Sequence, residues 1–492
     1  MPIANTVPVM RWASTDAGMI PRKKWARLGI SFLLYGIPAQ VAAVSATWSE
    51  WWVHGAWCVG GFLLAFPIIV RAVRRGAQLV IQDHLVMFTA AFAVYFVVGA
   101  ALLAFGSADS IERALSYYQI NASGALRADA VNAFGFGTAI LAAAYSPHSW
   151  FERRVLEIGR ACARLPPRLI LLGFLTVSLI ANATVTISDI SSESAVVAGS
   201  WRVLTQLSLV SVFLGISYRG RGRRLVWLLA TAVMAFEVVS GLLLLNKSKA
   251  LLPIMAYVGG LSLRCRPRVV VPVGVAVIAS FYVGIGGVVS FGRKATISSG
   301  WVSLEDRVQV LGDGVQSAAE DDPSADYYGW NRISYTVPQV AALEFYDSGR
   351  GGKDFQMIPW LFLPRALFPR KPIITQTGRD FHEKISGREG SSTGQGIFSS
   401  GYYNGGWFGL FVASALCGWI LAQTSAIARA VLRQNALLLF PLALFGVKIA
   451  FRIDAVFLAD WCGSFVIIAY AVVVGALLVR LTRLGRGARH EA

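Results

Sequence analysis

The sequence predicts an all-α protein that crosses a membrane about twelve times and carries one long loop outside the cytoplasm. Three observations predict this class. Hydrophobic residues make up 55% of the 492 residues, charged residues only 15%, and the mean hydropathy is +0.57, which does not describe a water-soluble globule. Apolar runs of about 20 residues, the length of a helix that crosses a bilayer, recur along the chain. Clusters of Lys and Arg separate these runs at alternate connections.

The first 27 residues are polar and basic, and no small-residue cleavage site follows the first apolar run. We therefore expect residues 1–27 to be a cytoplasmic tail before an uncleaved signal-anchor helix. Nine spans are expected within residues 28–291 and three within 404–479, followed by a cytoplasmic tail at 480–492. The expected spans lie near residues 28–47, 55–71, 85–105, 127–145, 169–188, 200–217, 225–245, 251–263, 269–291, 404–424, 435–452 and 461–479.

Seven cationic segments predict the orientation of these spans. With twelve spans, all seven fall on one side, and the positive-inside rule makes that side cytoplasmic, with both termini there. The formal charge of +18 is therefore mainly an orientation signal, and we expect no nucleic-acid partner. The segments are RKKWAR, RAVRR, ERRVLEIGRACARLPPR, YRGRGRR, RCRPR, ARAVLRQ and RLTRLGRGARH.

The five cysteines are scattered among the spans and cytoplasmic connections, and none lies in the long outer loop. No disulfide framework is indicated, and no Cys/His spacing resembles a metal site. We expect neither a metal nor another cofactor.

The long loop, residues 292–403, divides by charge into an acidic half and a basic half. Residues 304–354 contain ten acids and four bases, and residues 355–403 contain three acids and six bases. Cations are normally depleted beside the outer face of a membrane, so the basic half indicates an anionic partner. Its bases are Arg365, Arg370, Lys371, Arg379, Lys384 and Arg388.

The stretch MIPWLFLPRALFPRKP, residues 357–372, predicts an interfacial or re-entrant segment. Its apolar run is too short to span, prolines interrupt a helix, and Trp and Phe favour the interface. Such a segment would hold Arg365, Arg370 and Lys371 at headgroup depth, where guanidinium forks suit phosphate oxygens. Two other interpretations stay open: these cations bind ordinary anionic phospholipid, or they pair with the acidic half of the loop.

The run SSTGQGIFSSGYYNGGWFGL, residues 391–410, is rich in glycine, which permits tight turns and close backbone approach. Tyr402, Tyr403 and Asn404 are candidates to stack on and hydrogen-bond a sugar. The alternative is an aromatic belt at the membrane interface, packed against small residues.

The segment NRISYTVPQVAALEFYDSGRGGKDFQMIPWLFLPRALFPRKP, followed by GYYNGGWFGL, resembles the bacterial oligosaccharide repeat-unit polymerases, the O-antigen polymerase (Wzy-type) family. The family pattern has an Arg in an amphipathic stretch, a Pro-Arg and Lys-Pro segment, and a Gly/Ser run that ends in Y-x-N-x-G-x-x-G. Phe368 and Gly405 depart from it, because the family usually has Trp and Phe there. The matching positions are Arg332, Pro364, Arg365, Pro369, Lys371, Pro372, Tyr403, Asn404, Gly406 and Gly409.

The resemblance implies a GT-C-like, multi-pass glycosyltransferase at the outer face of the bacterial inner membrane. It would transfer a glycan from undecaprenyl pyrophosphate onto a lipid-linked repeat unit, with inner-membrane lipid and a chain-length regulator as further partners. The spacing of Arg379 and Gly390 is similar to arginine motifs in loops of this family. Further cations that would contact the pyrophosphate are Arg332, Lys247, Lys249, Lys448 and Arg452.

The expected chemistry needs a base for the attacking sugar hydroxyl and cations for the departing pyrophosphate. The candidate bases are His382, Asp380 and Glu383 in GRDFHEK, although a lone histidine in a loop is more often a surface residue. No G-x-x-x-x-G-K-[ST] motif is present, and the lipid pyrophosphate is already a good leaving group. We therefore expect a metal-independent enzyme.

Two alternatives stay open. An O-antigen ligase shares the lipid-linked donor and the general design, and the sequence does not separate the two. A transporter or lipid-linked glycan flippase is the other alternative, but such carriers tend to show internal repeats, and none is found here.

Overall fold

The computed structural model describes residues 19–45, 50–116, 118–147, 150–162, 166–190, 204–220, 222–299, 304–319, 330, 333–363, 368, 370–387 and 392–487. All regular secondary structure in these ranges is helical, which confirms the predicted all-α class. The helices are α1 (Arg22–Val44), α2 (Trp51–Arg75), α3 (Ala77–Gln82), α4 (His84–Phe92), η1 (Ala93–Val98), α5 (Leu102–Phe105), α6 (Ala108–Leu115), α7 (Ala122–Tyr145), α8 (Trp150–Cys162), α9 (Pro167–Ile190), α11 (Leu207–Ser217), α12 (Arg223–Leu243), α13 (Lys247–Ser262), α14 (Pro267–Ser299), α15 (Leu304–Ala319), α16 (Thr336–Asp347), η4 (Asp354–Met357), α17 (Ile358–Leu361), η5 (Ile374–Gln376), α18 (Thr377–Ser386), α19 (Ile397–Arg433), η6 (Leu437–Leu439), α20 (Phe440–Phe451), η7 (Phe457–Cys462) and α21 (Gly463–Gly487).

Seven helical segments are long and apolar enough to cross a membrane, so the chain is a multi-pass membrane protein. Three shorter apolar helices, in α11, in the first half of α14 and in η6 with α20, coincide with further expected spans. The count of twelve spans stays a prediction, because α7 and α13 are neither among the seven long segments nor among the three shorter apolar helices. The seven segments are Arg22–Val44, Trp51–Arg75, His84–Phe105, Pro167–Ser188, Arg223–Leu243, Ile397–Arg433 and Phe457–Leu481.

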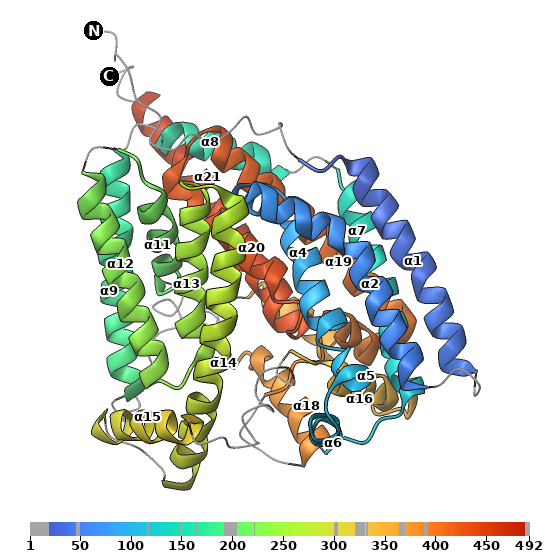
Figure 1. Cartoon of the computed structure of the whole chain (residues 1–492). Helices are drawn as coiled ribbons and strands as arrows, with labels where there is room; N and C mark the ends of the chain where they lie inside the picture. Colours follow the sequence, from blue (N-terminus) through green and yellow to red (C-terminus); the bar gives the residue numbers. More distant parts are fainter. Residues whose placement is uncertain are drawn as a thin grey trace.

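The long helices stand side by side in one bundle (Figure 1). One group contains α1, α2, α4, α7 and α19, a second contains α9 and α11–α14, and α20 packs between them against α4, α11 and α19. The beginning of α1, the end of α21 and α8 lie at one end, which we call the terminus end. The loop end carries α6, α15, α16 and α18 (Figure 1).

Small residues allow α7 to pack closely between α1 and α19. A Cβ added at Gly29 of α1 would lie 3.0 Å from the carbonyl oxygen of Gly137 in α7, and one added at Gly418 of α19 would collide with the carbonyl of Ala139. Lipid tails are as apolar as side chains, so helices in a membrane associate through such close packing more than through the hydrophobic effect. This explains why α7 is rich in Gly and Ala.

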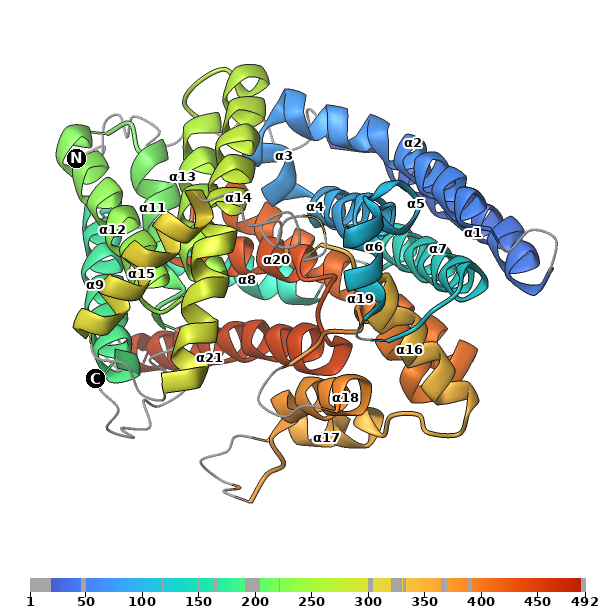
Figure 2. The ribbon, with the colours of Figure 1, turned by 60° about the horizontal axis from the view of Figure 1, so that its bottom comes forward.

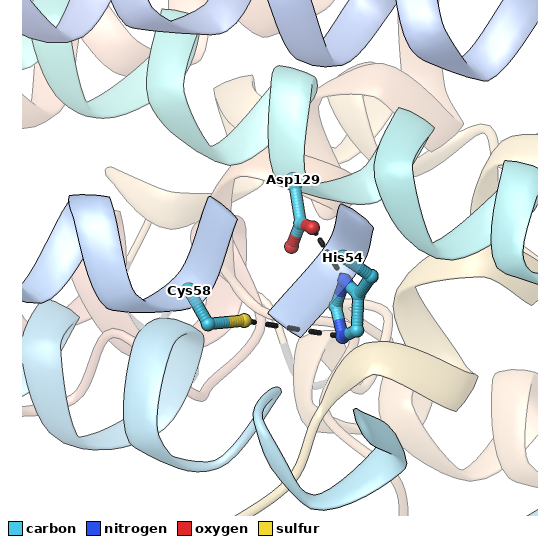
Figure 3. Close-up of side chains that lie close together, drawn as sticks. All are labelled: His54, Cys58 and Asp129. Atoms are coloured by element: carbon cyan, nitrogen blue, oxygen red, sulfur yellow. Dashed lines mark hydrogen bonds and ion pairs between the residues drawn. The ribbon is translucent and has the colours of Figure 1, made fainter. Parts of the chain in front are cut away.

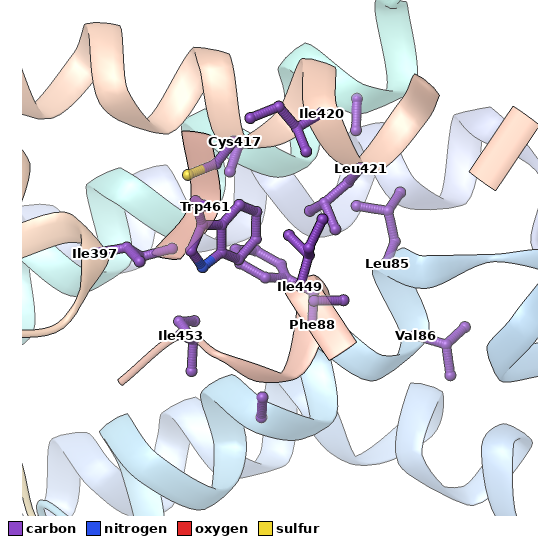
Figure 4. Close-up of a cluster of buried hydrophobic side chains, with 14 of the residues drawn as sticks. Leu85, Val86, Phe88, Ile397, Cys417, Ile420, Leu421, Ile449, Ile453 and Trp461 are labelled. Atoms are coloured by element: carbon purple, nitrogen blue, oxygen red, sulfur yellow. The ribbon is translucent and has the colours of Figure 1, made fainter. Parts of the chain in front are cut away.

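Aromatic and branched side chains fill the centre of the bundle where α4, α19, α20 and η7 meet (Figure 4). Trp461 is fully buried there and its ring meets that of Phe88 edge to face, with centroids 5.6 Å apart. Phe88 also stacks on Phe136 of α7 at 5.3 Å. The site at the loop end is therefore built on a rigid centre.

The long loop is shorter than the sequence predicts, because helices extend into it from both sides. Helix α14 continues to Ser299, and α19 begins at Ile397 instead of near 404. Between them lie α15, α16, α17 and α18, and α17 and α18 lie beside α21 (Figure 2). The acidic run at 320–326, together with Arg332, Arg365 and Arg388, lies outside the described residues.

Candidate functional site

The glycine run forms a sharp kink in α19. Gly405 has φ −170° and ψ 22°, and Gly406 has φ 58° and ψ −146°, so the helix breaks and restarts there. Glycine is required at Gly406, because its φ lies in the left-handed region and a Cβ would stand 2.7 Å from Cε1 of Tyr346. Gly401 and Gly409 touch across the kink, which lets residues 397–404 fold back on the rest of α19.

Tyr402 lies at this kink and ties three helices together. Its hydroxyl accepts a hydrogen bond of 2.6 Å from Nη2 of Arg127 in α7 and donates one of 3.1 Å to Oδ1 of Asp347 in α16. Arg127 also forms an ion pair with Asp347. The Tyr402 side chain is buried and its hydroxyl is bonded to protein groups, which is a structural role.

Tyr403 and Asn404, at the kink, bind residues of the long loop. Lys384 Nζ donates to the Tyr403 hydroxyl at 2.8 Å. Asn404 Oδ1 accepts from the backbone N–H of Asp354 at 2.7 Å, and Asn404 Nδ2 donates to the Asp354 carboxylate at 3.1 Å. Burial raises the pKa of the Asp354 carboxyl, although the Asn404 hydrogen bond and the Lys384 charge lower it. Sugar binding by residues 402–404 stays a prediction.

Helix α18 carries the three candidate bases. Phe381 is its buried anchor and meets the ring of Tyr403 at 5.4 Å. His382 Nδ1 lies 2.7 Å from the hydroxyl oxygen of Thr393, whose backbone N–H donates to the carbonyl of Gly378. Arg379, Asp380 and Glu383 lie on the exposed face of α18, whereas His382 is half-buried. Of the three candidates, His382 alone has a side-chain hydrogen bond that orients it.

A groove of about 450 Å³ separates the basic segment from α21. Lys371 lies in it, and its Nζ donates to the carbonyl of Leu363 at 2.9 Å. Arg370, next to it, is exposed. Apolar side chains dominate the rest of the lining. Ile467, Tyr470 and Val474 of α21 are also exposed, as expected for a surface that faces lipid, whereas Val466 is buried. The lining residues are Leu361, Leu363, Lys371, Ile374, Ala459, Gly463, Val466, Ile467, Tyr470 and Val474.

Arg452 is held by two carboxylates. Its Nη2 lies 3.1 Å from Asp460, and its Nε lies 3.5 Å from Asp454, which also accepts from the hydroxyl of Tyr335 at 3.2 Å. Burial raises the pKa of the Asp454 carboxyl against the opposing effect of Arg452. A pyrophosphate would have to compete with both carboxylates for Arg452.

The remaining expected phosphate ligands lie on other helices. Lys448 Nζ donates to Oε1 of Gln206 at 2.8 Å, a contact that joins α20 to the residues just before α11. Lys249 Nζ donates to Thr186 of α9 at 2.9 Å, and Lys247 Nζ lies 5.5 Å from the ring centroid of Tyr282 in α14. The structure thus places Lys371 beside α21 and α18 against the α19 kink, while Lys247 and Lys249 belong to the second helix group.

A buried polar cluster of α2 and α7 was not predicted from the sequence (Figure 3). His54 Nδ1 lies 2.6 Å from Oδ2 of Asp129, its Nε2 lies 3.0 Å from the carbonyl oxygen of Ala100, and the Cys58 sulfur lies 3.9 Å from the same Nε2. The sequence contains one hint of this cluster: His54 and Cys58 are four residues apart, which places both on one face of a helix.

Among the described residues, His54, Cys58 and Asp129 form the one group whose ligand atoms are close enough to hold a metal ion. We interpret the group as a buried ion pair, because each ring nitrogen already faces an acceptor and a doubly protonated imidazole satisfies both. A metal ion would have to displace a proton from one of these nitrogens.

Comparisons of the chain with protein-family models, with curated proteins and with solved structures find no match. The family resemblance therefore rests on the residues quoted above. Function has to be argued from the geometry at the loop end.

Proposed function

We propose that the chain is a polysaccharide polymerase of the bacterial inner membrane, acting on O-antigen or exopolysaccharide. It transfers a growing glycan from undecaprenyl pyrophosphate onto a lipid-linked repeat unit at the outer face, without a metal ion. The order and spacing of the motif residues, and the groove that contains Lys371, support this proposal.

The groove is the observation that carries the proposal. A polyprenyl pyrophosphate needs an apolar channel that opens to lipid and a cation at headgroup depth. The lining residues Ile467, Tyr470 and Val474 are 41–52% exposed on the face of α21, so a polyprenyl chain can lie against them from the bilayer. Lys371 lies in the groove and Arg370 directly precedes it, and both can bind phosphate oxygens.

We propose the following reaction at the groove. The acceptor hydroxyl oxygen forms a bond to the anomeric carbon of the donor sugar, and the bond from that carbon to the pyrophosphate oxygen breaks. The bonding electrons leave with the pyrophosphate, where Lys371 and Arg370 offset the added negative charge. His382, oriented by Thr393, accepts the proton of the acceptor hydroxyl.

A groove-filling substitution tests the lipid site. Ile467→Trp, at a lining residue that is 42% exposed, places a large ring in the groove, whereas Val473→Trp, also on α21 and 39% exposed, adds the same ring outside the lining. Purified variants are labelled with a photoactivatable polyprenyl pyrophosphate, and the labelled peptides are identified.

We expect label on residues 361–374 and on α21 in the wild type and in Val473→Trp, and several-fold less label in Ile467→Trp. Label elsewhere, or equal label in both variants, would contradict a donor site in this groove.

A further inference from the structure

A hollow of about 490 Å³ lies at the terminus end, where α12 begins. Its lining consists of Arg219, Gly220, Gly222, Arg223 and Arg224, and it shares no lining residue with the groove described above. Gly222 has a φ of 78°, in the left-handed region that favours glycine, and it turns the backbone into α12. The turn presents the three arginines around one concave surface.

Two neighbouring connections add cations to this hollow. The guanidinium carbon of Arg168, at the beginning of α9, lies 3.6 Å from the position of a Cβ added at Gly222. Arg219 Nη2 donates to the carbonyls of Leu263 at 3.0 Å and Arg264 at 3.4 Å, just before α14 begins. Three connections between helices therefore meet at one cationic surface.

No acid compensates this charge within the part of the chain that the structure describes. The exposed arginines of these connections form no ion pair with a described carboxylate, and the first turns of α9, α12 and α14 contain no acid. Helix N-termini carry partial positive charge, so this arrangement is unfavourable unless an anion binds. The arginines are Arg168, Arg219, Arg223, Arg224, Arg264, Arg266 and Arg268.

The residue types specify the anion. Every cation in these three connections is arginine and none is lysine, although an ammonium would serve equally well as an orientation signal. Guanidinium forks donate paired hydrogen bonds to phosphate oxygens. Several forks around one hollow suit a ligand that carries more than one phosphate.

Exposed apolar side chains place that ligand in the membrane. Leu169 follows Arg168, Leu225 follows Arg224 and Val269 follows Arg268, and these three side chains are 48–64% exposed. Leu228 and Val273 continue the exposed apolar faces of α12 and α14 by one helical turn. A ligand in the hollow therefore has apolar surface directly beside its phosphates, which a soluble anion would not use.

We propose that the hollow binds the headgroup of a phospholipid that carries two phosphate groups, with its acyl chains against α9, α12 and α14. Basic pockets between membrane helices on the cytoplasmic side are suited to such headgroups. The site is separate from the proposed polymerase site and requires no catalysis.

The test compares Arg223→Gln/Arg224→Gln with Arg153→Gln/Arg160→Gln. The control pair removes two exposed arginines from α8, at the same end of the bundle but outside the hollow. Both proteins are purified in detergent, and native mass spectrometry measures binding of cardiolipin, of phosphatidylglycerol and of soluble pyrophosphate. Thermal unfolding in detergent without lipid checks that each variant is folded.

We expect the wild type and the control to bind cardiolipin in preference to both other ligands. Loss of two arginine contacts should weaken cardiolipin binding roughly 30-fold in the Arg223→Gln/Arg224→Gln variant. Equal cardiolipin binding by the two variants would overturn the site. Pyrophosphate binding as tight as cardiolipin binding would overturn its assignment to a lipid.

Discussion

The two ends of the bundle use cations in opposite ways. At the loop end, Arg127 pairs with Asp347, Arg452 with Asp454 and Asp460, and Lys384 with the hydroxyl of Tyr403. Around the start of α12, the described arginines are exposed, Arg219 donates to backbone carbonyls, and no described carboxylate forms an ion pair with them.

This difference shows that the sequence position of a cation does not reveal its role. The loop-end pairs join α7, α16, α18 and α19 into one frame, so most of their charge is used within the protein. Lys371 and Arg370 instead lie in or next to an apolar groove. We therefore propose phosphate binding for these two residues and structural roles for Arg127, Lys384 and Arg452.

The largest expected effect is on the unfolding free energy and concerns the buried His54–Asp129 pair near the loop end. Replacing His54 by Ala leaves the Asp129 carboxylate buried without its partner, which costs about 3–5 kcal/mol of unfolding free energy. Arg153→Ala, which removes an exposed cation from α8 at the terminus end, should cost less than about 0.5 kcal/mol. Denaturant unfolding in detergent measures both. Equal losses would mean that the cations of the two ends are not used differently.

The second prediction separates the loop-end cations by function. Lys371→Ala and Arg370→Ala should each lower the polymerisation rate by about one to two decades, as expected for a lost charge-assisted contact of about 1.5–3 kcal/mol. Lys353→Ala, an exposed lysine of the same loop, is the control. Rates with purified protein, at equal protein abundance, provide the measurement. Full activity of both variants would favour binding of ordinary phospholipid by these cations.

The third prediction concerns the kink that supports the loop end. Gly406→Ala forces a side chain into the left-handed region and against Tyr346, and should destabilise the protein by about 1–3 kcal/mol. Gly405→Ala is a matched control, because its φ of −170° suits any residue and its Cβ would meet only a carbon of Phe355 at 3.7 Å. Thermal unfolding of the two variants should differ. Equal unfolding midpoints for the two variants would show that the kink does not require glycine at position 406.

The smallest expected effect is a pH dependence at Asp354. Burial raises the pKa of this carboxyl in the folded protein above its ordinary value of 3.8, so the folded state binds the proton more tightly than the unfolded state. Its contribution to stability is present at low pH and is lost as pH rises through the folded pKa. The unfolding free energy of Asp354→Asn should therefore fall less than that of the wild type as the pH rises from about 4 to neutral. Denaturant unfolding across this pH range measures the effect, with Asp109→Asn, exposed on α6, as the control substitution.

Much of the fold follows from apolar run lengths, because a bilayer demands about 20 apolar residues for each helix. The span expected at 127–145 corresponds to α7, although α7 packs through Gly and Ala and carries Arg127 and Asp129. The break at Gly405–Gly406 is where the tenth expected span begins, but the helix before it was missed. Its Ser and Gly residues suggested a loop.

The candidate site was predictable only in part. The basic half-loop and its proximity to α19 follow from motif order, and the structure places α18 against the kink. Pairing could not be predicted, because the partners lie far apart in the sequence: Arg127 and Asp347 are 220 positions apart, and Asn404 and Asp354 are 50 apart. The His54–Asp129 pair joins residues 75 positions apart, and only the packing of α2 against α7 brings them together.

The most direct test of the central claim is polymerisation by the purified protein in liposomes, supplied with one lipid-pyrophosphate-linked repeat unit and excess chelator. We predict a ladder of lipid-linked products that grows by whole repeat units, unchanged by added magnesium or manganese, and absent when lipid A core replaces the lipid-linked acceptor. Activity that requires a divalent ion would contradict a site based on Lys371 and Arg370. Transfer of the glycan to lipid A core instead of a growing ladder would identify a ligase and contradict the assignment as a polymerase.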